Sequence, residues 1–103
     1  MRSSALRLGR ADEAVAVCER ILSTTDPRLV WQVAETLVLL SEAWVLKGEP
    51  GAATHRLEQA AGLTRVTENE RDMRAVRKVL NLIRQRWTGV PEVRRLDELL
   101  RAN

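Results

Sequence analysis

The chain has 103 residues, of which 45% are hydrophobic and 30% charged, and its formal net charge is +3. This length suits one small domain with a single core and excludes a large enclosed active site. The single cysteine excludes an internal disulfide, and the longest apolar run, 37–40, is far shorter than the roughly 20 residues of a membrane span. We therefore expect a soluble, cytoplasmic protein without a membrane partner.

The first half of the chain predicts two helices and a short fragment. Gly9 ends the N-terminal fragment, and residues 11–23 follow with apolar side chains at helical spacing. The Asp-Pro pair at 26–27 suits the N-cap and first position of a longer helix. That second helix runs over 27–47 and stops at Gly48, because glycine readily adopts the left-handed conformation of a helix end.

Three further helices follow a Gly-Glu-Pro-Gly turn at 48–51. The first covers about 50–63. Thr67 and Glu70 have the spacing of a capping box, which predicts the start of the next helix. Pro91 opens the last one. The predicted fold class is all-α, with five main helices plus an N-terminal helix fragment, arranged as antiparallel hairpins because the connections are short.

The chain contains an internal repeat. Gly9 and Gly48 lie 39 positions apart. A glycine lets the chain reverse between helices, and an alanine five residues later lets two helices approach closely. The residues that recur at the same offsets from the two glycines are Ala14 and Ala53, then Glu19 and Glu58.

Residues 34–60 resemble the tetratricopeptide repeat, a helix pair with a period of about 34 residues. Leu37 stands at the family's usual Trp, and Trp44 stands at its Tyr. The other matching positions are Leu40-Ser41 at the Leu-Gly pair and Gly48, Ala53, Leu57 and Ala60 at the Gly, Ala, Phe and Ala positions.

The resemblance implies one tetratricopeptide-like helical domain over residues 1–103. Within it, 1–25 is a partial repeat, 27–64 is a full repeat, and 67–102 is a degenerate helical hairpin. The hairpins would stack as a short right-handed superhelix, as they do in the family.

The family also implies a partner and a groove. Its first helix in each pair lines a groove that binds a protein or peptide, so we expect a non-catalytic binding scaffold. Carried over by position, the groove residues of this chain are Glu35, Val38, Glu42, Val45 and Leu46. This strip is acidic and apolar, which favours a basic or amphipathic partner.

The C-terminal tail has a second resemblance. Residues 74–99, including the segment Trp87-Thr-Gly-Val-Pro91, resemble the end of bacterial helix-turn-helix regulators of the Cro/repressor-like class, in which tetratricopeptide repeats follow a DNA-binding domain. The alternative function is therefore a truncated C-terminal sensory or dimerisation segment of a transcription regulator.

The start of the chain bears on both hypotheses. Only eight residues precede Gly9, too few for the first helix of a complete pair. Helix 11–23 should therefore expose an apolar edge near the N-terminus. We expect a truncated gene product or a homo-oligomer in which another copy covers this edge.

A third hypothesis concerns a basic face on the fourth main helix. Such a face can bind phosphates, but a solvated surface is favoured, since acidic residues on the same helix offset its charge and no aromatic ladder is present to stack bases. Direct nucleic-acid binding is therefore disfavoured. The residues of this basic face are Arg71, Arg74, Arg77, Lys78 and Arg84.

No catalytic, metal-binding or cofactor-binding residue is predicted, and we expect no enzyme activity. Cys18 falls at a packing position and is expected to be a buried structural thiol. His55 should point outward, and one His with one Cys makes no metal site. Trp44 and Trp87 are expected to pack inside, whereas Trp31 either covers the missing first helix or faces a partner.

Overall fold

The computed structural model describes the backbone of residues 2–101 and the side chains of residues 9–101. This part of the chain contains five helices and no strand, which confirms the predicted all-α fold. The helices are α1 (Arg2–Thr24), α2 (Val30–Lys47), α3 (Pro50–Thr67), α4 (Glu70–Arg86) and α5 (Pro91–Arg101).

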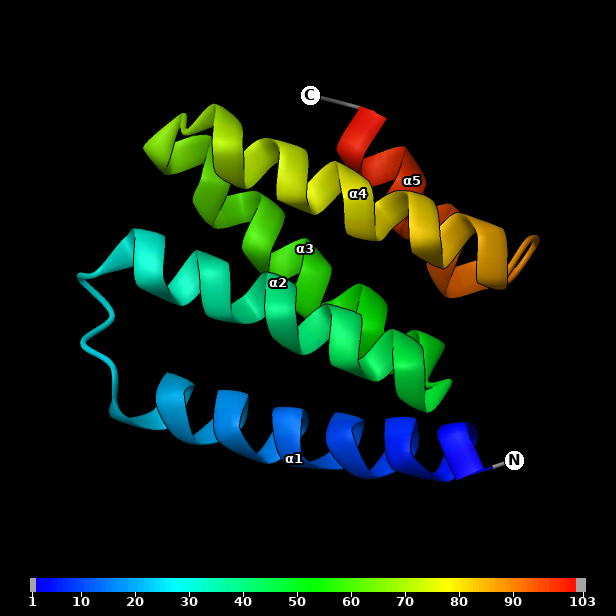
Figure 1. The fold of residues 1–103 in the computed structure, drawn as a ribbon. Coiled ribbons are helices and arrows are strands. Elements are labelled where there is room, and N and C mark those ends of the chain that lie inside the picture. Colours follow the sequence, from blue (N-terminus) through cyan, green and yellow to red (C-terminus); the bar gives the residue numbers. More distant parts are fainter. Residues whose placement is uncertain (1, 102–103) are drawn as a thin grey trace.

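Consecutive helices run antiparallel, as short connections require (Figure 1). Helix α2 lies between α1 and α4 and also packs along α3, while α5 packs on α3 and α4. In Figure 1, α3 and α5 lie behind α2 and α4. The helices thus stack as hairpins, and the right-handed superhelix stays a prediction.

Helix α1 differs from its predicted form. It runs unbroken through Gly9 for 23 residues, so the separate N-terminal fragment was wrong. A lone glycine in a helix costs about 1 kcal/mol relative to alanine, which is too little to stop a helix whose neighbours favour it. A Cβ atom at Gly9 would meet no described atom within 4 Å beyond the backbone of its own helix, so no close approach of another helix requires the glycine.

Helix α2 begins at Val30, three residues later than the Asp-Pro pair predicted. The Asp26 Oδ1 atom accepts a hydrogen bond from the Arg28 backbone N–H at 2.9 Å. The Asp26 carbonyl accepts another from the Leu29 N–H at 2.9 Å. These two bonds form a turn, which is the other structure that an Asp-Pro sequence favours.

The junction between α3 and α4 also differs from the capping-box prediction. Helix α3 continues to Thr67 and ends at Glu68, whose φ of 53° is left-handed. Asn69 is the N-cap of α4, because its Oδ1 accepts hydrogen bonds from the N–H groups of Arg71 at 2.9 Å and Asp72 at 3.4 Å. Asparagine caps helices at least as well as threonine, so it displaces the predicted Thr67 cap.

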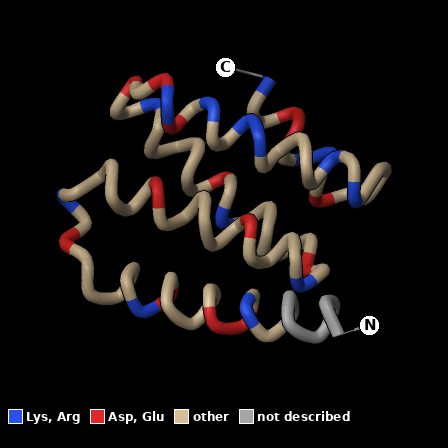
Figure 2. Tube along the Cα trace, viewed as in Figure 1, with Lys and Arg blue, Asp and Glu red and all other residues tan. Residues whose placement is uncertain are grey.

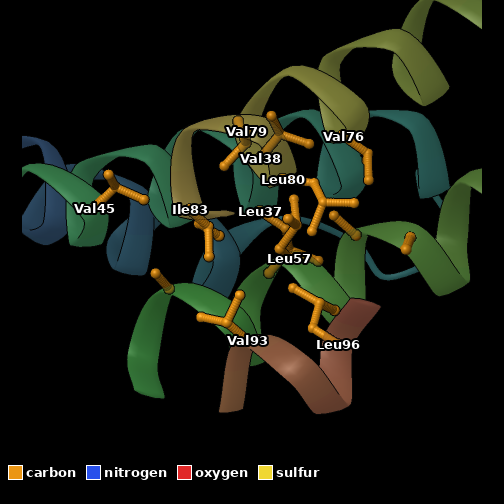
Figure 3. Close-up of a cluster of buried hydrophobic side chains, with 13 residues drawn as sticks. Leu37, Val38, Val45, Leu57, Val76, Val79, Leu80, Ile83, Val93 and Leu96 are labelled. Carbon is orange, nitrogen blue, oxygen red and sulfur yellow. The ribbon is translucent and has the colours of Figure 1, made fainter. Parts of the chain in front are cut away.

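The hydrophobic core lies among α2, α3, α4 and α5 (Figure 3). Leu37 of α2 and Leu57 of α3 meet at its centre, and Ile83 of α4 lies nearby. The Ser41 hydroxyl donates a hydrogen bond of 2.7 Å to the Ala53 carbonyl, so the small side chains at these positions bring α2 and α3 close together. Burial of this cluster is the main stabilising contribution to the fold.

Helix α1 is attached to this core by fewer buried side chains. Ala11 and Cys18 are its buried residues among those described. Two ion pairs add to the attachment. They join Lys47 Nζ to Asp12 at 2.6 Å, and Arg56 Nη2 to Glu19 at 2.8 Å.

Candidate functional site

Several exposed apolar side chains of the described chain gather in a groove between α1 and α2. Four large side chains that line it keep much of their surface in water: Val17 (49%), Ile21 (40%), Leu39 (54%) and Leu46 (49%). The groove has a volume of about 600 Å³. We call it the N-terminal groove; its lining is Arg10, Glu13, Ala14, Val17, Cys18, Ile21, Leu39, Glu42, Ala43 and Leu46.

The internal repeat explains why this groove is open. In α3, the repeat residues Ala53 and Ala60 are fully buried, because α2 and α4 pack over them. Their counterparts in α1 are Ala14, which is half-buried, and Ile21, which is largely exposed. The surface that α2 covers on α3 therefore has no covering helix on α1 within the described residues.

The charges on the walls of this groove are mostly acidic. Glu13 of α1 and Glu42 of α2 lie on its two walls, and Arg10 lies at one end. None of the three forms an ion pair with another described residue. Glu13 and Arg10 can therefore meet the charges of a bound partner, whereas Glu42 also faces basic residues of α4.

The five residues predicted to line the binding groove do not share one surface. Val38 and Val45 are buried in the core, because α4 packs against that side of α2. Val38 still lines a hollow between α2 and α4, together with Glu35 and Glu42, and the partner-contact role of the five residues stays a prediction. Glu42 and Leu46 line the N-terminal groove. Glu35 is exposed and lies at a different hollow, described next.

That hollow has a volume of about 350 Å³ and lies at the surface between α2 and α4. Glu35 and Glu42 line its α2 wall, and Arg71 and Lys78 line its α4 wall. The basic residues offset the acidic strip that the sequence predicted. Trp31 also lines this hollow with its side chain exposed, so the structure places it at the surface rather than in a covering role.

The predicted basic face of α4 is divided by the packing of the helix. Figure 2 shows Lys and Arg at several positions along α4. Arg71 and Lys78 point towards α2, whereas Arg77 and Arg84 lie on the opposite flank, near α5. Arg74 is exposed and lies 3.7 Å from Glu70 on its own helix. The five side chains therefore form no single phosphate-binding surface.

The remaining candidate residues behave as packing or surface residues. Cys18 is buried, as predicted, and this burial together with the neighbouring Glu19 raises the pKa of its thiol. His55 is exposed, as predicted. Trp44 and Trp87 are half-buried against the core, as predicted. Within residues 9–101, no three His, Cys, Asp or Glu side chains gather where they would hold a metal ion.

Sequence reasoning missed Val17, Ile21 and Leu39 as groove residues. Leu39 and Leu46 are spaced by seven residues, or about two helical turns, which places them on one face outside the core stripe of α2. This second stripe was the available signal. Its meaning depends on whether another helix covers it, which the sequence does not specify.

Comparison with family models, with curated proteins and with solved structures gives no significant match to this chain. No helix in the described residues is both long and apolar enough to cross a bilayer.

Proposed function

We propose that the protein is a non-catalytic, tetratricopeptide-like binding module whose N-terminal groove takes up an amphipathic helix with basic flanks. The observation that carries this proposal is the clustering of Val17, Ile21, Leu39 and Leu46 in one open groove. Contiguous exposed apolar surface of this kind is typical of protein-binding sites.

The repeat indicates that the partner segment is helical. Helix α2 packs over the part of α3 that corresponds to the exposed part of α1. From Arg10 to Ile21 the groove follows eleven residue steps of α1, about 16 Å, which matches three turns of a partner helix. Such a helix would place apolar side chains at spacings of three and four residues between α1 and α2.

The acidic walls indicate the charge of the partner. Glu13 and Glu42 flank the apolar floor from opposite sides, and Arg10 is the one basic residue among the described lining residues. Lys or Arg side chains beside the apolar stripe of the partner would face these carboxylates. This complementarity mainly raises the association rate and selects against acidic helices.

A second candidate function has support from the same surface. The exposed α1–α2 edge also favours a homo-oligomer in which another copy of the chain covers the groove, as in a dimerisation segment of a helix-turn-helix regulator. Direct nucleic-acid binding has less support, because the basic residues of α4 are divided between two flanks. We place the protein in the cytoplasm, where its free thiol would stay reduced.

The test uses two labelled helical peptides that share one leucine stripe and differ only in flanking Lys or Glu. Fluorescence anisotropy should show binding of the Lys peptide to the native chain, and Leu39→Glu should weaken it by about tenfold or more. Val66→Glu serves as the control, because Val66 is exposed outside the groove. Equal affinities for native protein and Leu39→Glu would contradict the proposal.

Sedimentation equilibrium separates the two candidates. A monomer that binds the Lys peptide supports the peptide-binding module. A dimer that Leu39→Glu dissociates, and that the Lys peptide does not disrupt, supports the homo-oligomer instead.

A further inference from the structure

A second groove lies at the other end of the molecule, among α3, α4 and α5. It has a volume of about 610 Å³. We call it the C-terminal groove. Its lining residues are Ala61, Thr64, Arg65, Met73, Val76, Arg77, Leu80, Asn81, Arg84, Leu100 and Arg101.

The charges at this groove are the reverse of those at the N-terminal groove. Arg65, Arg77, Arg84 and Arg101 line it, and no Asp or Glu is among its described lining residues. Asp97 lies behind the rim, where it pairs with Arg84 and lies 3.6 Å from Arg101. Arg65 and Arg77 form no ion pair with a described residue, so the groove keeps a positive charge.

The floor between these arginines is apolar. Met73 is half-buried and Val76 and Leu80 are buried along α4, and Leu100 of α5 and Ala61 of α3 complete the lining. A groove that only attracted phosphates would not need this floor, because phosphate contacts are made by charged and polar groups. An apolar floor with a basic rim suits a ligand that has an apolar stripe between acidic groups.

The geometry points to an acidic amphipathic peptide segment as the ligand of the C-terminal groove. This inference does not depend on the proposed function of the N-terminal groove. Along α4 the groove extends from Met73 to Arg84, which are eleven residue steps or about 16 Å apart. Three turns of a helical peptide fit that length, with apolar residues on the floor and Asp or Glu towards the rim.

Arg77 has donor groups available for such a ligand. Arg77 is exposed and forms no ion pair within residues 9–101. Arg84 is already engaged, because its Nη2 atom pairs with Asp97 and its Nη1 atom donates a hydrogen bond of 3.4 Å to Asn81 Oδ1, so it contributes mainly its charge. A carboxylate at the rim can accept from guanidinium groups in a charge-assisted, directional contact.

The test uses the Glu-flanked peptide described above and a scrambled peptide of the same composition. The native chain should bind the amphipathic Glu peptide and not the scrambled one. Arg77→Glu should weaken binding by about tenfold, because it replaces an attractive charge with a repulsive one. Arg71→Glu is the matched control: it makes the same charge change on α4, but Arg71 faces α2 and should change affinity less than about twofold.

The position of the bound peptide can be read from the methionine methyl groups. The chain has two methionines, Met1 and Met73, and Met73 lines the C-terminal groove. In the protein with carbon-13-labelled methionine methyls, the Glu peptide should shift the Met73 signal, and Leu39→Glu should leave this shift unchanged.

Three results would overturn the inference. They are equal binding of the scrambled peptide, equal losses from Arg77→Glu and Arg71→Glu, and complete displacement of the peptide by anionic phosphatidylserine vesicles. The first two would indicate unspecific attraction to a basic protein, and the third would indicate a lipid surface. Failure here leaves the Lys-peptide result at the N-terminal groove intact, so the two proposals are distinguishable.

Discussion

Residues 9–22 and 48–61 have related sequences but different surroundings. The second segment contains the first part of α3, which lies under α2 and α4, and its Ala53, Leu57 and Ala60 are fully buried. The first lies in α1, where Ile21, the counterpart of Ala60, keeps 40% of its surface in water. The same pattern of small and apolar residues therefore lies in a filled interface in α3 and beside an open groove in α1.

The two repeat glycines account for much of this difference. Gly48 ends α2 with a φ of 78°, so the chain reverses and α2 folds back over α3. Gly9 lies inside α1, and no reversal occurs there. Residues 2–8 continue the helix, so no other described helix covers the face of α1 that α2 covers on α3. The repeat sequence thus specifies which face of each helix is apolar. A turn such as the one at Gly48 then determines whether another helix of the same chain covers that face.

The largest expected effect on stability is at Leu57 of α3, whose counterpart in α1 is Cys18. Leu57→Ala should lower the free energy of unfolding by about 2–5 kcal/mol, because it opens a cavity in the core. Cys18→Ala removes one buried sulfur near an open groove and should cost about 1 kcal/mol. Urea denaturation followed by circular dichroism measures both. Equal losses would mean that α1 is as tightly packed as α3.

Ala60 of α3 and Ile21 of α1 are the next pair of counterparts, and exchanging their residue types tests how tightly each site is packed. Ala60→Ile should destabilise by about 1–3 kcal/mol, because the close contact of α3 leaves no room for a larger side chain. Ile21→Ala makes the opposite change on an exposed side chain and should cost less than about 1 kcal/mol. The same urea titrations measure the two values, and a tolerated Ala60→Ile would contradict the tight packing of α3.

Replacing each of the two glycines by alanine should change the stability of the fold in opposite directions. Gly48→Ala should destabilise by about 1–2 kcal/mol, since it forces a left-handed residue and brings a Cβ atom to 3.3 Å from Arg86 Nη2. Gly9→Ala should stabilise by about 0.5–1 kcal/mol, because the site is helical and has open space. Thermal unfolding gives both shifts. Destabilisation by Gly9→Ala would indicate that the helix is interrupted at that residue.

The smallest effect on stability is expected at the ion pair that links the two segments. Arg56, which stands where α1 has Val17, reaches from α3 to Glu19. Arg56→Ala should cost about 1 kcal/mol or less, because both side chains are partly exposed to water and ions. The loss should shrink at high salt. A larger, salt-independent loss would show that the pair holds α1 in place by packing rather than by charge.

Local chemistry allowed much of the fold to be predicted, but the candidate sites depended on packing. Gly48 placed the end of α2, Pro50 and Pro91 placed the starts of α3 and α5, and the outward position of His55 followed from the repeat. The helix ends at Asp26 and Thr67 were wrong, because Asp-Pro also forms turns and Asn69 is a competing cap. The division of basic residues such as Arg71 and Arg77 between two flanks depends on where α2 and α5 pack.

The most direct test of the account is whether a helix covers the N-terminal groove. A single thiol can be placed there by Ile21→Cys in a Cys18→Ser background, with Val66→Cys in the same background as the control. Alkylation of the Ile21→Cys thiol should slow several-fold when the Lys-flanked peptide saturates the protein, while the control rate stays unchanged. Unchanged alkylation at Ile21→Cys, despite saturation seen by anisotropy, would contradict the account.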